Sequence, residues 1–247
     1  MALNKESNQY IFIFSSVLVI LVGAILAFLA VYLQPFQSEN IQNEKKQNIL
    51  QAIQVQVSRD EAEKAFGQYI TSQLVLNYDA QVVGQNAFDI DIQKEYKSIA
   101  DLKLRNYPLY VATKDNQTYY IIPLIGTGLW GPVWGFVALK ADAVTIYGAS
   151  FGHRGETPGL GAEITEPAFY NQFVGKKIAD LSNAYVKLQV IKPGSAPMDD
   201  HTVDGITGGT LTSVGVEEML NRILEVYHRY FKQLKSNQVG SEVVEQI

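Results

Sequence analysis

An uninterrupted apolar run at residues 11–33 (IFIFSSVLVILVGAILAFLAVYL) constrains the fold of this chain more than any other feature. As a helix, its 23 uncharged residues would measure about 34 Å, against a bilayer hydrocarbon core of roughly 30 Å. The alternative is a buried core helix, but such helices seldom run this long with only two serines as polar residues. The run is also too long for a typical signal-peptide core. We predict one transmembrane helix that anchors the protein to a lipid bilayer.

The charges beside this run do not predict its orientation. Lys5 precedes it, and Lys45 and Lys46 follow it among Glu39 and Glu44. The positive-inside rule therefore gives no direction.

Composition narrows the function classes. The net charge is -5 and the pI is near 5.3, so the sequence predicts no nucleic-acid partner. The absence of cysteine excludes disulfides, iron–sulfur ligation, c-type haem attachment and thiol catalysis. The three histidines, at 153, 201 and 228, lack metal-ligand spacing, so we predict no metal site. A redox protein of this composition needs an organic electron carrier.

The remaining pattern predicts an α+β fold, with a mostly antiparallel sheet and packed helices, tethered by the single N-terminal transmembrane helix. From about residue 78 the pattern is typical of strands. Strand-like runs lie at 111–113, 119–122, 136–139, 144–147 and 186–191, and a short helix is predicted at 166–173. We divide the chain into a tail (1–10), the membrane helix (11–33), a connecting helix or linker (34–66), a folded domain (67–235) and a C-terminal tail (236–247).

A long amphipathic helix is predicted near the end of the chain. Its apolar residues follow helical spacing and indicate a face that packs on the core: Val216, Met219, Leu220, Ile223, Leu224, Tyr227 and Phe231.

The segment just before this helix reads DGITGGTLTS, residues 204–213. Gly208 and Gly209 permit a tight turn and leave room beside Thr210. The N-terminus of the following helix favours a negatively charged group at that position. An ordinary loop with a helix cap is the structural alternative.

Two further motifs lie upstream. HRGETPGLG at residues 153–161 reads as a rigid, proline-containing loop, and GLWGPVWG at 128–135 carries both tryptophans. Trp130 and Trp134 are more often core aromatics than cofactor contacts.

The Asp-x-x-Thr-Gly-x-Thr pattern resembles the motif of proteins that carry FMN esterified through its phosphate to the last threonine, here Thr210. Gly209 stands where that motif usually has alanine. Together the three motifs resemble the C subunit of the sodium-translocating NADH:quinone oxidoreductase, from the membrane segment to about Ser236. The G subunit of the Rnf electron-transport complex shares two of the motifs and is the alternative. The GLWGPVW stretch favours the C subunit.

The resemblance implies a covalent flavoprotein that relays electrons from NADH towards ubiquinone within a larger complex and has no catalytic residue of its own. A separate flavin transferase would attach the FMN from FAD, with release of AMP. Asp204 would assist recognition or proton removal, and Thr207, Gly208 and Gly209 would shape the turn.

The resemblance also implies a wall for the flavin ring. Glu156 and Thr157 would hydrogen-bond the ring edge and Leu160 would pack on its face, with Gly159, Gly161 and Trp134 as further contacts. The expected location is the bacterial inner membrane, with the flavin domain on the periplasmic side and other subunits of the complex as partners.

Two motif matches suggest other classes of protein. Residues 126–131 match G-x-G-x-x-G, but Pro132 and Gly135 prevent the helix that a dinucleotide site requires, so we expect a hairpin or bulged turn. Residues 148–152 match G-x-S-x-G, with Asp199 and His201 downstream, which makes a serine hydrolase a remote alternative. A further alternative is a membrane-anchored sensory or scaffold domain without a cofactor.

Overall fold

The computed structural model describes residues 7–195, 197 and 199–244. Residues 1–6 and 245–247 of the two predicted tails lie outside the described residues. The chain forms two compact units, Met1–Lys45 and Lys46–Ile247.

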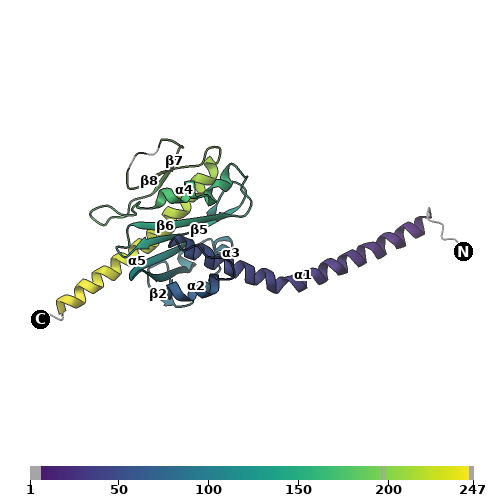
Figure 1. The fold of residues 1–247 in the computed structure, drawn as a ribbon, viewed down its shortest axis with the longest axis horizontal. Helices are drawn as coiled ribbons and strands as arrows, with labels where there is room; N and C mark the ends of the chain where they lie inside the picture. Colours follow the sequence, from purple (N-terminus) through teal and green to yellow (C-terminus); the bar gives the residue numbers. More distant parts are fainter. Residues whose placement is uncertain (1–6, 196, 198, 245–247) are drawn as a thin grey trace. The chain divides into compact units, whose positions relative to one another are not determined.

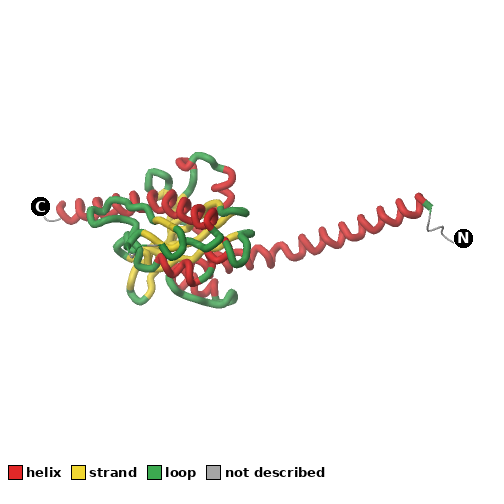
Figure 2. Tube along the Cα trace, turned by 90° about the horizontal axis from the view of Figure 1, so that it is seen from above, coloured by secondary structure: helices red, strands yellow, loops and turns green. Residues whose placement is uncertain are grey.

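The helix α1 (Asn8–Ala52) makes up most of the first unit (Figures 1 and 2). Its last residues, 46–52, belong to the second unit. α1 includes the whole apolar run and is long and apolar enough to cross a membrane, with a mean hydropathy of 2.9 in its most apolar stretch. The helix continues past Pro35 and through the first part of the connecting segment as far as Ala52. The predicted connecting helix is interrupted at residues 53–61 before α2 (Ala62–Tyr69) begins.

The second unit is built on a six-stranded sheet in the order β2-β1-β3-β4-β5-β6, in which every neighbouring pair is antiparallel. Its strands are β1 (Ile70–Leu76), β2 (Val82–Gly84), β3 (Tyr107–Lys114), β4 (Gln117–Thr127), β5 (Pro132–Lys140) and β6 (Ile146–His153). The prediction that strands begin at about residue 78 is wrong, because β1 precedes that point. β1 lacks a clear alternation of apolar and polar residues, and its pairing with β3 is a long-range effect.

Several further elements connect the strands or pack against this sheet. They are η1 (Ala87–Asp89), α3 (Ile92–Ser98), η2 (Leu102–Leu104), η3 (Gly161–Thr165), α4 (Pro167–Tyr170), η4 (Asn171–Phe173), the parallel strands β7 (Gln189–Ile191) and β8 (Thr202–Asp204), and α5 (Thr210–Val244). Of the strand-like run at 186–191, only β7 is a strand.

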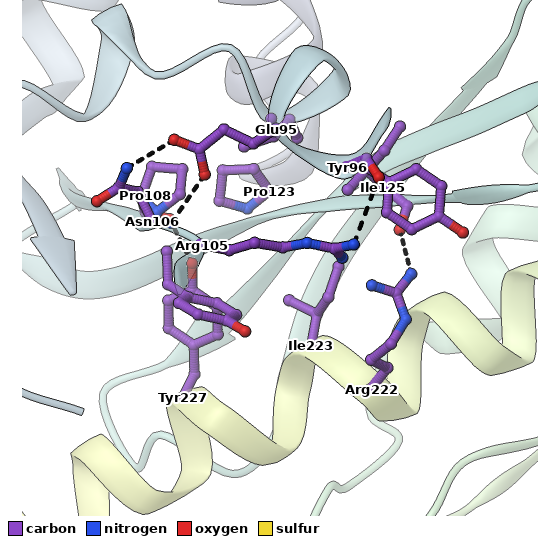
Figure 3. A pocket seen from close by; sticks show the side chains of 12 residues that line it. Glu95, Tyr96, Arg105, Asn106, Pro108, Pro123, Ile125, Arg222, Ile223 and Tyr227 are labelled. Carbon is purple, nitrogen blue, oxygen red and sulfur yellow. Dashed lines mark hydrogen bonds between the residues drawn. The ribbon is translucent and has the colours of Figure 1, made fainter. Parts of the chain in front are cut away.

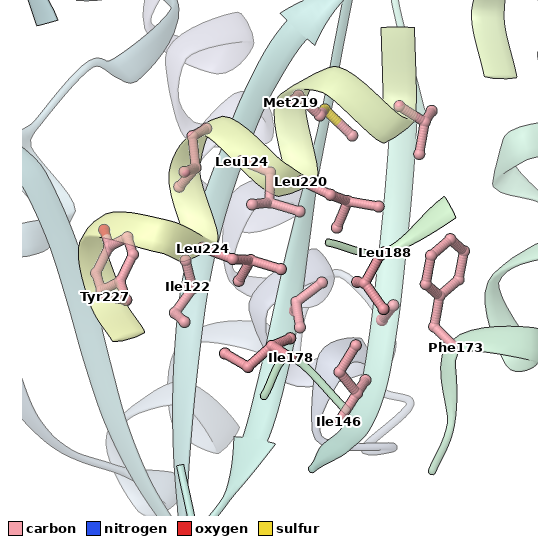
Figure 4. Close-up of a cluster of buried hydrophobic side chains, with 14 of the residues drawn as sticks. Ile122, Leu124, Ile146, Phe173, Ile178, Leu188, Met219, Leu220, Leu224 and Tyr227 are labelled. Atoms are coloured by element: carbon pink, nitrogen blue, oxygen red, sulfur yellow. The ribbon is translucent and has the colours of Figure 1, made fainter. Parts of the chain in front are cut away.

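Apolar side chains fill both faces of the six-stranded sheet. On one face, Met219, Leu220 and Leu224 of α5 pack towards Ile122 and Leu124 of β4 (Figure 4). The opposite face carries the end of α1 and α2 in a second cluster of buried residues. All seven apolar residues predicted for the C-terminal helix are buried. The α+β prediction with a mostly antiparallel sheet is therefore confirmed, and α5 packs on the sheet through the apolar residues predicted from the sequence.

Candidate functional site

The turn before Thr210 joins the end of β8, at Asp204, to the start of α5. Gly208 has a φ of +72°, a left-handed conformation that favours glycine. The carbonyl of Gly209 accepts the Ser213 N–H at 2.9 Å, so Gly209 caps the helix and Thr210 is its first residue. The N–H groups of a first helical turn have no partners within their own helix. The Thr210 hydroxyl therefore lies where an anion is favoured.

The hydroxyl groups of this segment differ in exposure. Thr207 and Thr210 are exposed, whereas Thr212 and Ser213 are buried. Ser213 Oγ accepts the Ile206 N–H at 2.9 Å, and Thr212 Oγ1 donates to Glu156 Oε2 at 2.6 Å. Of the two exposed threonines, only Thr210 is at the start of the helix.

The loop that follows β6 lies against this turn. The carbonyl of Thr157 accepts the N–H groups of Leu160 and Ala162, both at 3.1 Å, while Gly159 has a φ of +75°. Leu160 approaches Gly208 so closely that a Cβ on Gly208 would lie 2.5 Å from Leu160 Cδ2. The side chains of Thr157 and Leu160 remain exposed, next to the turn that presents Thr210.

Glu156 is buried, with only 4% of its surface exposed. Its Oε1 accepts the Trp130 N–H at 2.8 Å, and its Oε2 accepts the Thr212 hydroxyl. A Cβ on Gly128 would lie 2.6 Å from Oε1, and one on Gly161 would lie 2.5 Å from Oε2. All three motifs therefore meet at this carboxylate, which points into the domain. Thr212, which completes the junction, was not among the site residues predicted from the sequence.

The two tryptophans occupy different environments. Residues 126–131 form the end of β4 and the turn of the β4–β5 hairpin expected from the sequence, and the turn is closed by a 2.7 Å hydrogen bond from Gly128 N to Gly131 O. Trp130 is 66% exposed at this turn, so its assignment to the core is wrong. Trp134 is half-buried on β5, and its indole lies over Gly152, where a Cβ would be 2.5 Å from Nε1.

Asp204 marks the point where β8 ends and the turn begins. Its Oδ1 accepts the Ser195 N–H at 3.1 Å. Its backbone is held by the side chain of Gln172, which accepts the Asp204 N–H at 2.8 Å and donates to the Asp204 carbonyl at 3.2 Å. Gln172 therefore fixes the start of the motif, and no sequence signal indicated that role.

The residues that suggested a hydrolase do not form a nucleophile elbow. Ser150 is buried within β6 and donates its hydroxyl to the Asn48 carbonyl at 2.8 Å. A loop, rather than a helix, follows β6. His201 Nδ1 lies 2.8 Å from the Lys177 carbonyl oxygen.

A separate pocket lies between α3, β3, β4 and α5 (Figure 3). In it the Tyr96 ring lies near two guanidinium groups, with Arg105 Cζ at 5.0 Å and Arg222 Cζ at 4.8 Å from its centroid. Arg105 donates to the Tyr96 carbonyl and Arg222 to the Ile125 carbonyl. Because these contacts join α3 to β4 and α5, we interpret the cluster as structural. None of the three motifs contributes to the pocket lining.

Comparison with known proteins agrees with the position of these motifs. The family described as the FMN-binding domain matches residues 128–225, which include all three. The C subunit of the Na(+)-translocating NADH-quinone reductase of Haemophilus ducreyi is 32% identical over 229 residues, covering 87% of this chain and 88% of the relative. The chain belongs to this C-subunit family. The corresponding protein of Pseudomonas aeruginosa is 31% identical over 240 residues, covering 88% and 92%.

Solved structures support the same assignment. The C subunit from Parabacteroides distasonis is 44% identical with a TM-score of 0.73, over 80% of this chain and 96% of that one. Shewanella oneidensis NqrC is 27% identical with a TM-score of 0.66, over 79% and 98%. The resemblance to the C subunit is thus confirmed, and these relatives favour it over the Rnf G subunit.

Proposed function

We propose that this chain is the C subunit of a sodium-translocating NADH:quinone oxidoreductase and relays electrons through FMN held as a phosphoester on Thr210. The observation that carries the proposal is the placement of Thr210. It is an exposed hydroxyl at the start of α5, directly after the turn in which Gly208 contacts Leu160, within the region that matches the FMN-binding family.

The residues around Thr210 fit the phosphate of such an ester. The first-turn N–H groups of α5 and the positive end of the helix dipole favour the phosphate charge. Gly209 is buried, and a Cβ there would lie 3.0 Å from Ile206 Cβ, so glycine lets the turn pack closely against Ile206, and alanine at this position would require only a small shift of that side chain. Thr207, at the outer side of the same turn, helps to shape it.

The exposed apolar side chains of the motifs suit contact with an aromatic flavin ring. Exposed apolar side chains from the motifs and the first turns of α5 offer it a hydrophobic contact: Leu129, Trp130, Leu160, Leu211 and Val214. We assign Thr157, Gly159, Leu160 and Gly161 to the loop that faces the ring, with Trp134 as a further contact from β5. Bound FMN supplies the redox chemistry, while the chain supplies position and electrostatic environment.

Attachment requires an accessible hydroxyl, which Thr210 provides. We propose that a separate flavin transferase joins Thr210 Oγ1 to the flavin-side phosphorus of FAD. The bond between the two phosphates breaks, AMP leaves, and the hydroxyl proton passes to a base. Asp204, at the fixed start of the turn, contributes to recognition of the motif or to removal of that proton.

The apolar stretch of α1 would anchor the protein in the bacterial inner membrane, with the flavin domain on the periplasmic side and other subunits of the complex as partners. Covalent attachment suits a domain outside the cytoplasm, where a lost FMN could not readily be replaced. Removal of residues 1–33 should then release a soluble domain that is still flavinylated but fails to restore quinone reduction in a complex lacking this protein. Full activity with the released domain would contradict the anchoring role.

Co-expression tests the central assignment. The full chain made with a flavin transferase should stay yellow after denaturation and desalting, and without the transferase it should be colourless. Thr210→Ala should abolish the retained colour. Thr113→Ala is the matched control, because it removes an exposed threonine on β3, outside all three motifs, and should still carry the flavin. Retention of covalent flavin by Thr210→Ala would refute the proposal.

A further inference from the structure

We propose that Glu156 is a positioning residue. Its buried carboxylate joins the β4–β5 hairpin, at Trp130, to the first turn of α5 and thereby determines the position of Thr210. This assigns its carboxylate to the protein rather than to the edge of the flavin ring. The consequence for Thr210 rests on the function proposed above, whereas the junction itself does not.

The two oxygens of Glu156 contact different parts of the chain. Oε1 accepts the backbone N–H of Trp130, 26 residues away, at 2.8 Å. Oε2 accepts the hydroxyl of Thr212, 56 residues away, at 2.6 Å. Glu156 is 4% exposed and Thr212 is 1% exposed, so water does not compete freely for these bonds. The carboxylate therefore links three segments that are distant in the sequence.

The glycines around this carboxylate support the same role. A Cβ on Gly128 or Gly161 would lie 2.6 Å and 2.5 Å from the two oxygens, too close for either side chain to remain in place. No lysine or arginine in the described part of the chain forms an ion pair with Glu156. Hydrogen bonds to the hairpin and to the helix thus define its position.

Loss of this junction would affect Thr210 through Thr212. Thr210 and Thr212 belong to the same first turn of α5, so a change in the anchoring of Thr212 alters the position of the modified hydroxyl. Truncation of Glu156 would also leave the Trp130 N–H and the Thr212 hydroxyl without their acceptor, and the loss is costly for the buried Thr212 hydroxyl. Glutamine retains one acceptor for Trp130 N–H, and its amide can donate to Thr212 Oγ1, so it can preserve the junction.

Amide exchange of the two tryptophans tests the junction directly. The chain has only two tryptophans, so the full-length protein labelled with 15N-tryptophan in detergent gives two backbone amide signals, which Trp134→Phe would assign. We expect the Trp130 amide to exchange about tenfold faster in Glu156→Ala, roughly the factor for one lost hydrogen bond. Glu156→Gln should remain close to wild type. The Trp134 amide lies in β5 between two strands and should not change, which verifies that the domain is folded.

Two matched variants separate the parts of the junction. Glu163→Ala removes a carboxylate of η3, close to Glu156 in the sequence. Among the described residues, the Glu163 carboxylate accepts a hydrogen bond only from the Gly159 N–H, so this variant should leave the Trp130 amide unchanged. Thr212→Val removes the bond to α5 and keeps the bond to Trp130. It should preserve the Trp130 amide protection yet slow flavin loading.

The rate of flavin loading tests the effect on Thr210. With purified transferase and FAD, Glu156→Ala and Thr212→Val should load about tenfold more slowly than wild type, and Glu156→Gln within about twofold. Unchanged Trp130 exchange in Glu156→Ala would overturn the junction. Flavin loading at the wild-type rate in both Glu156→Ala and Thr212→Val would overturn the effect of the junction on Thr210. If wild type itself carries no flavin, the proposed function fails, while the amide exchange still decides the junction.

Discussion

Leu160 and Gly208 are in such close contact that a Cβ on Gly208 would lie 2.5 Å from Leu160 Cδ2. The contact brings the loop after β6 against the turn before α5, although the two residues lie far apart in the sequence. Gly208 also has a φ of +72°, so both its backbone conformation and its neighbour require glycine.

Gly208→Ala should therefore distort the turn that presents Thr210. The left-handed conformation costs a non-glycine residue about 1–2 kcal/mol, and the clash with Leu160 adds to this cost. We expect a lower free energy of unfolding and a reduced fraction of covalently flavinylated protein, measured by chemical denaturation and by fluorescence of the denatured protein in gels.

Gly155→Ala is the matched control for this change. A Cβ on Gly155 would meet no atom within 4 Å, and its φ is not in the left-handed region. That variant should load normally. Equal loading of Gly208→Ala and wild type would contradict the role assigned to the turn.

Leu160→Ala tests the apolar contact with the flavin ring. Leu160 is 41% exposed, so its removal should cost no more than about 1 kcal/mol of stability. The variant should remain yellow after denaturation but show altered midpoint potentials, where about 30 mV corresponds to 1.4 kcal/mol for a two-electron couple. Leu181→Ala, at a fully exposed leucine, should leave the potentials unchanged. Unchanged potentials in both Leu160→Ala and Thr157→Ala would place the ring elsewhere.

The sequence predicted those parts of the fold that depend on local patterns. The spacing of Met219, Leu220 and Leu224 indicated the buried face of α5, and the glycines at 126–131 indicated a hairpin. It did not predict β1, whose pairing with β3 is long-range, nor the burial of Glu156. An acidic residue in a glycine-rich loop is usually solvated, and its two hydrogen-bond donors lie 26 and 56 residues away. No local pattern encodes such a contact.

Gly215→Ala should loosen the packing of α5 on the hairpin. A Cβ on Gly215 would collide with the backbone carbonyl of Thr127, so the helix or the strand must move. We expect a loss of about 1–3 kcal/mol in the free energy of unfolding, despite the better helix propensity of alanine. Gly67→Ala in α2 is the control, since a Cβ there meets no atom within 4 Å and the change should stabilise by about 0.5–1 kcal/mol. Both variants gaining stability would show that α5 can shift freely.

His228 should make stability depend on pH. Burial lowers the pKa of this imidazole below its usual value of 6.5, with Lys232 and Lys235 acting in the same direction. Below pH 6.5 the unfolded chain therefore binds a proton that the folded chain does not, and stability falls as pH decreases towards the lowered pKa. His228→Phe should keep the ring contact with Tyr185 and lose this part of the pH dependence. Denaturant unfolding at several pH values checks it, and identical slopes for both proteins between pH 7 and 5 would contradict the prediction.

The most direct test of the central claim is the mass of the peptide that contains residues 204–213, taken from full-length protein produced with a flavin transferase. The intact protein should be heavier than the polypeptide by one FMN less one water. The peptide should carry the same added mass, and its fragmentation should place that mass on Thr210. The buried hydroxyls of Thr212 and Ser213 should be unmodified. Added mass on Thr207, Thr212 or Ser213, or a peptide with no added mass from a chain that is active in its complex, would contradict the account.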